Sequence, residues 1–322
     1  MIFIVGIGTT NLTPLFPTCG VGSSVDALNV DLTLSKGSSL AMRISGLAKM
    51  GLANGSYMKV VLFCGGLGTR IRDYSENIPK PMIPIGPQPM LWHIMQYYSN
   101  YGHRDFILCL GYKPNVIKDY FLNFKPSTQG DFVISNFGKK VEVLGANPPD
   151  WRITLVDTGI WRNIGERLVA VKHLLKDEEF FLANYTDGLT DAPLPKIIEC
   201  LKRSGKVAGF MAVRPQFTFH LAEFNNEGAV SQFRASQESD MWINGGYFVF
   251  RKKIFDFIRE GEELVAEPFN RMIEVGELFA YKYEGFWRAM DTLRDKQILE
   301  DMVEKGNMPW RIGAQPEGKA PL

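Results

Sequence analysis

Residues 58–70 read MKVVLFCGGLGTR, an apolar run that ends in a glycine-rich loop. Continuous apolar residues are typical of a strand that is buried on both faces. A glycine loop at the carboxyl end of such a strand lets backbone N–H groups approach a phosphate closely. The loop is neither a dinucleotide-binding fingerprint, since Ile71 stands where the third glycine would fall, nor a P-loop, since no Gly-Lys-Ser/Thr follows. Taken alone, it fits a tight turn without a ligand equally well.

From Met58 onward, expected strands alternate with expected helices. Strands are predicted over 59–63, 105–110, 152–157, 179–184 and 207–213, and helices over 91–101, 115–124, 165–175 and 194–204. Such alternation predicts parallel strands joined by crossover helices. After about residue 215 the pattern is less regular, with strands expected at 230–233 and 246–250 and helices at 253–259 and 293–304.

The first 57 residues differ from the rest of the chain. They are rich in Gly, Ser, Thr and Leu, carry few charges and show no sustained helical or strand period. We interpret residues 1–57 as a leader outside the fold, with Met58 as a candidate start, residues 58–312 as the folded domain and 313–322 as a tail. An ordered extra element at 1–57 is the alternative.

Composition excludes several classes of protein. The chain has 322 residues with a net charge of +1, 45% hydrophobic and 22% charged residues, which are ordinary globular values. The near-zero net charge argues against a general nucleic-acid binder, which would show a strong basic excess. No stretch of the sequence approaches the roughly 18 consecutive apolar residues that a membrane-spanning helix needs. The cysteines lack zinc-site spacing, and we expect reduced thiols in a cytoplasmic protein. They are Cys19, Cys64, Cys109 and Cys200.

Two basic residues follow the glycine loop. Arg70 closes it, and Lys80 stands ten positions further on, between Pro79 and Pro81. A guanidinium binds phosphate oxygens in a bidentate manner, and a lysine supplies a mobile point charge. Because the prolines hold this segment extended, a phosphate-binding Lys80 is favoured over a solvated surface lysine.

Two acidic residues are candidate metal ligands. Asp187 follows an apolar strand, where ligands bind in open α/β sheets. Asp291 lies in the segment GFWRAMDTLRD at 285–295. Two carboxylates together with substrate phosphates commonly hold Mg²⁺. For Asp291 alone, the residue pattern favours a helix N-cap or a first-turn acid at the run 292–302.

Several long strings occur in one order along the chain. They are FCGGLGTRIRDYSENIPKPMIPIG (63–86), PMLWHIMQYYSNYGHRDFILCLGYK (89–113), TLVDTG (154–159), WINGGYFVF (242–250) and GFWRAMDTLRDKQILEDMVEKGNMPW (285–310). Together they resemble the sugar-phosphate nucleotidyltransferases, and among these the glucose-1-phosphate cytidylyltransferases. The resemblance covers about 58–312.

This resemblance implies a fold and an activity. The fold would be an α/β domain with a Rossmann-like mixed, mainly parallel sheet flanked by helices, of the nucleotide-diphospho-sugar transferase type, and a smaller sugar-binding portion. The enzyme would transfer CMP from CTP to a sugar 1-phosphate, expected to be glucose 1-phosphate, with Mg²⁺ as cofactor. A homo-oligomer with no nucleic-acid or membrane partner is expected.

Residue roles follow by position from the resemblance. The implied nucleotide-binding residues are Leu62, Gly65, Gly66, Leu67, Gly68, Thr69, Arg70, Gly111, Arg167 and Thr186. The implied catalytic residues are Arg70, Lys80 and Asp187, and the Mg²⁺ ligands are Asp187 and Asp291. The sugar phosphate would be bound by Lys80, Asn244, Gly245 and Trp287.

The chain departs from the family pattern at three places. Ile164 stands where members usually have a threonine, and Thr186 replaces a glycine. A Glu-Lys-Pro string that normally precedes the INGG strand is missing, and Arg234 is the candidate substitute for its lysine. A different nucleotide, or a different phosphate or phosphonate acceptor, would explain changes clustered near the substrates. A nucleotide-binding protein without turnover is a further alternative, against which the retained reaction residues argue.

Overall fold

The computed structural model describes residues 57–66, 78–124, 132–137, 139–143, 149–216, 220–236 and 240–312. The predicted leader (apart from Tyr57), most of the glycine loop and the predicted tail lie outside these residues. The proposed domain bounds therefore stay predictions. No helix within the described part of the chain combines the length and apolar character that crossing a membrane requires.

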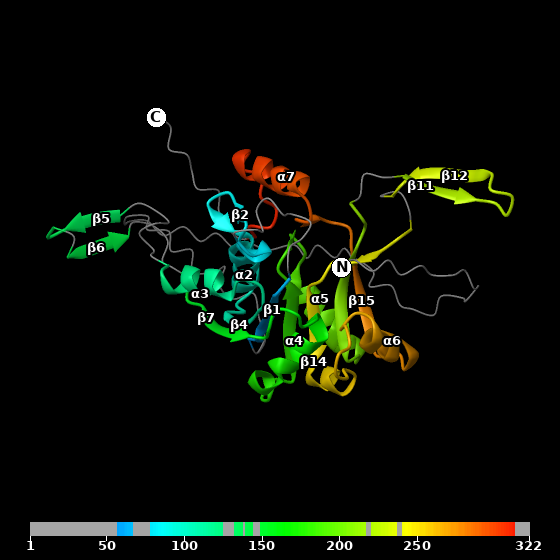
Figure 1. The fold of residues 1–322 in the computed structure, drawn as a ribbon, viewed down its shortest axis with the longest axis horizontal. Helices are drawn as coiled ribbons and strands as arrows, with labels where there is room; N and C mark the ends of the chain where they lie inside the picture. The colour runs from blue at the N-terminus through cyan, green and yellow to red at the C-terminus, as the bar shows by residue number, and fades with distance from the viewer. Residues whose placement is uncertain are drawn as a thin grey trace, which may run out of the picture. The chain divides into compact units, whose positions relative to one another are not determined.

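One mixed sheet organises the described residues, in the order β7–β4–β1–β8–β14–β10–β15 (Figure 1). The strands are β1 (Val60–Cys64), β4 (Asp105–Leu110), β7 (Arg152–Asp157), β8 (Phe180–Tyr185), β10 (Ala208–Val213), β14 (Phe248–Arg251) and β15 (Leu278–Tyr283). Neighbouring strands are parallel except at β14, which runs antiparallel to both β8 and β10. The predicted mixed, mainly parallel sheet is confirmed.

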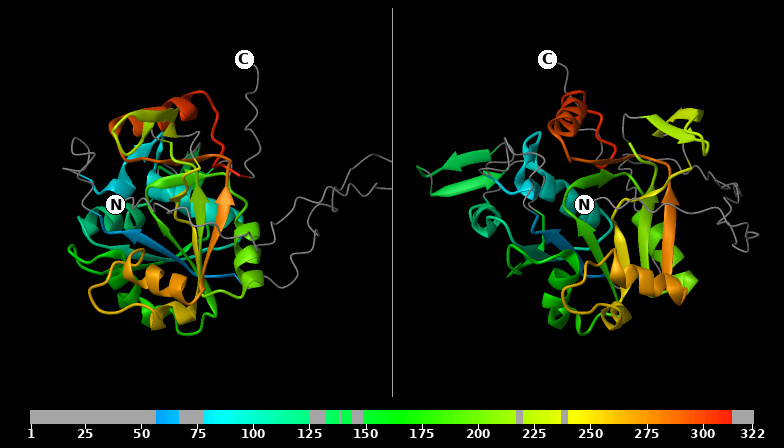
Figure 2. Two further views of the ribbon diagram at one scale, coloured as in Figure 1. Left: turned by 90° about the vertical axis from the view of Figure 1, so that its right-hand side faces the viewer. Right: turned by 45° about the vertical axis from the view of Figure 1, so that its right-hand side comes forward.

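Helices cover both faces of the sheet (Figure 2). Val60 and Leu62 of β1 pack with α2 (Met90–Asn100), α3 (Pro114–Leu122) and α5 (Leu194–Ser204). Val61 and Phe63 point to the other face and pack with α4 (Ile164–Ala170) and α6 (Glu267–Glu274). Side chains alternate between the two faces along a strand. Because helices cover both faces here, both sets of side chains are buried and apolar. This explains the continuous apolar run at the start of the fold.

Smaller elements complete the chain. Two-stranded ribbons are formed by β2 (Pro84–Ile85) with β3 (Gln88–Pro89), β5 (Phe132–Ser135) with β6 (Lys140–Val143), β9 (Gly188–Thr190) with β16 (Trp287–Ala289), and β11 (His220–Phe224) with β12 (Val230–Ala235). Strand β13 (Ile243–Asn244) pairs with β10, and α7 (Leu293–Glu304) follows β16. The 3₁₀ turns are η2 (Lys80–Met82), η4 (Lys172–Leu175) and η6 (Lys252–Asp256). The expectation that the segment around Lys80 is extended is therefore wrong for Lys80–Met82, although Pro79 and Ile83 on either side are extended.

Most of the predicted elements between residues 58 and 215 agree with the structure, and so does the last helix. Strands β4 and β7 and helices α5 and α7 have the predicted bounds. The helix expected at 165–175 divides into α4 and η4, and the one expected at 253–259 is the 3₁₀ turn η6. Strands β11 and β15 and helix α6 were not predicted. Helix α4 ends at its C-cap Val171, whose backbone lies outside helical geometry.

A buried histidine forms a hydrogen bond with the backbone just before β1. His103 is only 6% exposed, and its Nδ1 accepts a hydrogen bond of 3.0 Å from the backbone N–H of Met58. Burial lowers the pKa of His103 to about 4. The folded state therefore requires the neutral imidazole.

We expect this histidine to make stability depend on pH. Its folded pKa lies below its unfolded value of about 6.5, so the unfolded chain binds the extra proton and stability falls as pH drops from 6.5 towards 4. Between pH 7 and pH 4, the native chain should lose about 3 kcal/mol more than His103→Gln. Urea unfolding at both pH values measures the difference, with His173→Gln as the exposed control. Equal pH slopes for the native chain and His103→Gln would contradict the assignment.

Candidate active site

Several of the predicted site residues that the structure describes lie at one edge of the sheet. Parallel strands end at the same edge, and there Gly65 follows β1, Gly111 follows β4 and Asp187 lies just beyond β8. Because β14 runs in the opposite direction, the chain just before it, including Asn244, lies at this edge too. Ligands in open α/β sheets bind outside the carboxyl ends of the strands. The topology thus brings together residues far apart in sequence.

A lysine and two carboxylates form the centre of this edge. Lys80 Nζ donates to Asp187 Oδ2 at 2.9 Å and to Asp291 Oδ1 at 2.7 Å. The three side chains are 17%, 34% and 22% exposed, respectively. Burial alone would lower the pKa of Lys80, but the charges of the two carboxylates outweigh it and the pKa is raised. The ammonium therefore stays charged at neutral pH.

A short ribbon holds the two aspartates together. Asp187 precedes β9 and Asp291 follows β16, and these strands pair antiparallel with Ala289 opposite Gly188. The N–H of Met290 donates to the carbonyl of Asp187 at 2.7 Å, which extends the pairing to the aspartates. The N-cap of α7 is Thr292, with Asp295 completing the capping box. The capping alternative for Asp291 is therefore wrong.

The carboxylate pair suits a divalent cation. Both carboxylates present an oxygen to one ammonium group, so they converge on a common point. Within the described ranges, no group of three or more His, Cys, Asp or Glu side chains could hold a metal ion. Mg²⁺ typically binds through one or two carboxylates, with waters and substrate phosphates completing its shell. Asp187 and Asp291 fit that donor set.

Arg167 is almost fully buried next to Gly65. Its guanidinium donates to the carbonyls of Leu110 and Gly65 at 3.0 and 3.1 Å and to Thr158 Oγ1 at 2.6 Å. Burial lowers its pKa. Arg167 therefore joins the ends of β1 and β4, and any direct contact with the nucleotide stays a prediction.

Two predicted glycines are required by this packing. A Cβ atom on Gly65 would collide with the Arg167 guanidinium, and one on Gly111 would lie 2.8 Å from both terminal nitrogens of the same group. Gly66 is exposed, and no atom of the described residues lies within 4 Å of the place where its Cβ would stand. The remaining predicted loop residues lie outside the described residues; they are Leu67, Gly68, Thr69 and Arg70.

Two predicted nucleotide-binding side chains are engaged inside the protein. Leu62 is fully buried in β1 and packs in the core, so its side chain supports the strand rather than facing the edge. Thr186 is also buried, and its hydroxyl donates to the carbonyl of Phe63 at 2.9 Å. The side chain that replaces the family's glycine therefore ties β8 to β1.

Asn244 and Gly245, two of the predicted sugar-binding residues, lie just before the reversed strand β14. Asn244 donates to the Tyr185 hydroxyl at 3.3 Å and accepts from the Gly246 N–H at 2.9 Å. Trp287 Nε1 donates to the carbonyl of Gly245 at 2.9 Å. These bonds fix the Trp287 ring against the strand and bring the three predicted residues together.

Ile164 and Arg234, the other departures from the family pattern, both lie in defined secondary structure. Ile164 begins α4, packs partly buried against the core, and follows Asn163, which caps the helix. Arg234 donates to Glu223 at 2.6 Å across the β11–β12 ribbon. The prediction that Arg234 replaces the missing lysine gains no support from this pairing.

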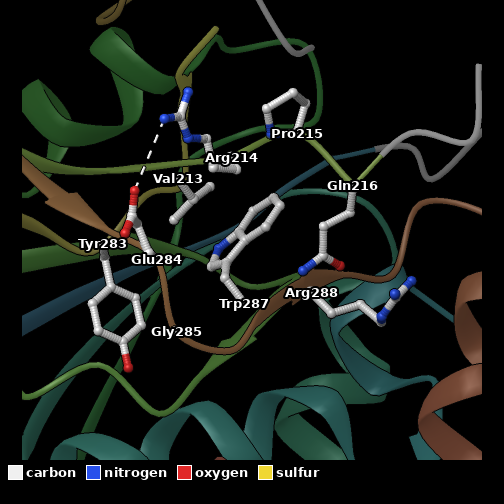
Figure 3. Close-up of a pocket in the computed structure, with 9 residues that line it drawn as sticks. All are labelled: Val213, Arg214, Pro215, Gln216, Tyr283, Glu284, Gly285, Trp287 and Arg288. Atoms are coloured by element: carbon white, nitrogen blue, oxygen red, sulfur yellow. Dashed lines mark ion pairs between the residues drawn. The ribbon is translucent and has the colours of Figure 1, made fainter. Parts of the chain in front are cut away.

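A pocket beside the β9–β16 ribbon contains residues that the sequence interpretation missed (Figure 3). It has a volume of about 320 Å³ and is lined by the ends of β10 and β15 and by β16. Its polar side chains include Arg214, Gln216 and Arg288. In the sequence, Arg214 and Gln216 were marked only by their position after the strand predicted at 207–213. Arg288 was marked only by lying in the family-like string at 285–310.

Comparisons with known proteins agree with this geometry. The family described as nucleotidyl transferase matches residues 59–295. Glucose-1-phosphate cytidylyltransferases from Salmonella typhimurium and Salmonella typhi are each 40% identical over 256 residues, which is 79% of this chain and 99% of theirs. A crystal structure of UDP-glucose pyrophosphorylase complexed with UDP-glucose has a TM-score of 0.56 at 15% identity, covering 78% of this chain and all of that one (100%), and shows the shared fold. The resemblance predicted from the motifs is confirmed, and the chain is an enzyme that belongs to the nucleotidyl transferase family.

Proposed function

We propose that this enzyme transfers CMP from CTP to glucose 1-phosphate, giving CDP-glucose and pyrophosphate. The observation that carries the proposal is the convergence of Lys80, Asp187 and Asp291 at the carboxyl edge of the sheet. The 40% identity to the Salmonella enzymes, over nearly their full length, supports the choice of substrates.

The chemistry requires positioning and charge neutralisation. A phosphate oxygen of the sugar phosphate attacks the α-phosphorus of CTP, the bond from that phosphorus to the β-phosphate oxygen breaks, and pyrophosphate leaves. The attacking phosphate is already anionic, so no protein base is needed. Lys80 can neutralise the reacting phosphates, because its ammonium remains charged. Arg70 is proposed to hold the leaving pyrophosphate.

Mg²⁺ is the proposed cofactor, with Asp187 and Asp291 as its protein ligands. When bound, the cation would neutralise phosphate charge at the reacting centre. Lys80 lies between the same two carboxylates, so the metal and the ammonium share one anionic site.

We further propose a cytoplasmic homo-oligomer. Cys64 and Cys109 are buried free thiols, as expected in a reducing compartment. Apolar side chains are exposed on two ribbons that are too small to be stable alone, among them Phe132 on β5 and Phe233 on β12. Contact with another copy of the chain would bury them.

Pyrophosphate release tests the function directly. With Mg²⁺ and glucose 1-phosphate, we expect release with CTP and much slower release with UTP, dTTP, ATP or GTP. A coupled phosphate assay measures the rate, and mass spectrometry identifies the nucleotide sugar. Heat-inactivated protein is the control. Release with another nucleotide only would change the proposed donor.

A different acceptor is the second candidate. It is favoured by the missing family lysine and by the pairing of Arg234 with Glu223. If CTP supports release only with another sugar phosphate or with a phosphonate, that acceptor replaces glucose 1-phosphate. Nucleotide binding without release over the whole panel would indicate a binding protein.

A further inference from the structure

Tyr247 lies just before β14 in a backbone conformation that tyrosine rarely adopts. Its φ is +50°, in the left-handed region, and the preceding Gly246 has a φ of +79°. Glycine adopts this region freely, whereas a residue with a Cβ atom is strained there. Such strain persists only where the surrounding structure holds the residue in place, and it is concentrated at functional sites. We therefore expect the Tyr247 side chain to have a specific task.

Contacts with β8 and α2 hold Tyr247 in this conformation. Its backbone N–H donates to Asn184 Oδ1 at 2.9 Å, and both residues are almost fully buried. A Cβ atom on Gly246 would collide with the same oxygen, so the chain passes close to β8 here. The Tyr247 ring packs edge-on against Tyr97 and stacks on Tyr98, with ring centroids 5.0 and 5.9 Å away. Backbone and ring are thus both fixed, and with them the direction of the hydroxyl.

The Tyr247 hydroxyl reaches the turn that carries Asp187. It donates to the carbonyl of Gly188 at 3.0 Å. Burial raises the pKa of Tyr247, so the hydroxyl keeps its proton and remains a donor. The carbonyl of Asp187 itself accepts from the N–H of Met290 at 2.7 Å. The two successive peptide groups that follow the Asp187 side chain are therefore each held by a hydrogen bond.

We propose that Tyr247 is a positioning residue, whose bond to Gly188 orients Asp187 so that its carboxylate converges with that of Asp291. Mg²⁺ requires near-ideal octahedral geometry, and contacts that orient a metal ligand strengthen the binding of the metal. Tyr247 acts through Gly188, since its own side chain lies inside the protein. Without the hydroxyl, the Gly188 peptide could rotate and the two carboxylates would lose their fixed spacing. This inference rests on the proposed role of Asp187 as a metal ligand.

The variant Tyr247→Phe removes the hydroxyl and keeps the ring. We expect it to weaken Mn²⁺ binding by the nucleotide-free protein on the order of 10-fold, because the Asp187 carboxylate is no longer held in place. Calorimetric titration with Mn²⁺ measures the affinity. The kcat for pyrophosphate release should also fall on the order of 10-fold, while the KM for glucose 1-phosphate stays the same.

A neighbouring tyrosine provides the matched control. Tyr97 is as deeply buried as Tyr247, and its hydroxyl also donates to a backbone carbonyl, that of Ala192 at 2.8 Å. Ala192 lies beyond the other end of β9, away from Asp187. Each Tyr→Phe variant loses one buried hydrogen bond, so both should lower the melting temperature by about 2 to 6 °C. Tyr97→Phe should leave Mn²⁺ affinity and kcat unchanged.

The comparison of the two variants decides the proposal. Weaker Mn²⁺ binding by Tyr247→Phe than by Tyr97→Phe, at similar melting temperatures, would support the positioning role, because a purely structural role would affect stability alone. Equal Mn²⁺ affinities of the two variants, including no detectable binding by either, would overturn it. The titration needs no turnover, so a native enzyme that binds Mn²⁺ but releases no pyrophosphate with any nucleotide would contradict the proposed function and not the role of Tyr247.

Discussion

Asp187→Asn is expected to lower kcat for pyrophosphate release by about 10³-fold, equivalent to about 4 kcal/mol. The substitution keeps the side-chain size but removes the charge that pairs with Lys80 at 2.9 Å. It also removes one of the two proposed metal ligands. Steady-state rates at saturating CTP and glucose 1-phosphate measure the loss.

The same substitution should affect stability much less. Asp187 is 34% exposed, and partly exposed ion pairs contribute about 1 kcal/mol or less. Asp105→Asn is a matched control, because Asp105 pairs with Arg152 at the start of β4, away from the carboxyl edge. Full activity of Asp187→Asn would remove Asp187 from the reacting centre. Calorimetry with Mn²⁺ should show weaker metal binding by Asp187→Asn than by the control.

Lys80→Met is expected to have two opposite effects. Turnover should fall on the order of 10²-fold to 10³-fold, because a preorganised cation is lost from the reacting phosphates. Metal binding by the nucleotide-free protein should instead become stronger. Lys80 neutralises both carboxylates in this structure, and its removal leaves them without that competing cation.

A second lysine provides the control. Lys59 also lies near a carboxylate, at 3.3 Å from Glu178, but at the opposite end of β1. Lys59→Met should change neither turnover nor Mn²⁺ affinity by more than about twofold, since its ion pair is partly exposed and remote. Weaker Mn²⁺ binding by Lys80→Met would show that the lysine orders the carboxylates rather than competing with the metal.

The sequence predicted the regular half of the fold because its signals are local. An apolar run buried on both faces identifies β1, and helix α5 begins and ends where predicted. The apolar run at the start of strand β15 (LFAYKY) is too short to distinguish a strand from a helix, and its side chains are only half-buried or exposed. Its existence depends on pairing with β10, which a single segment does not encode.

In the candidate site, too, some residues could be predicted from local sequence and others depend on tertiary structure. Asp187 could be predicted because it follows a buried strand, where parallel sheets bind ligands. Residue pattern alone favoured a helix cap for Asp291, and the register of β9 with β16 shows otherwise. For Gln216 the sequence showed only a position after a predicted strand. Its Oε1 is buried and accepts no hydrogen bond from any described residue, and an unpaired buried oxygen is a property of tertiary packing.

The ribbon that holds the aspartates also has a consequence for biosynthesis of the enzyme. Lys80 and Asp291 are separated by 211 positions in sequence, and Asp291 follows every strand of the main sheet. A nascent chain still on the ribosome can therefore complete the sheet before β16 emerges. Such long-range contacts form late, because loop closure must precede them. Tight metal binding would thus distinguish finished molecules from truncated or partly folded ones.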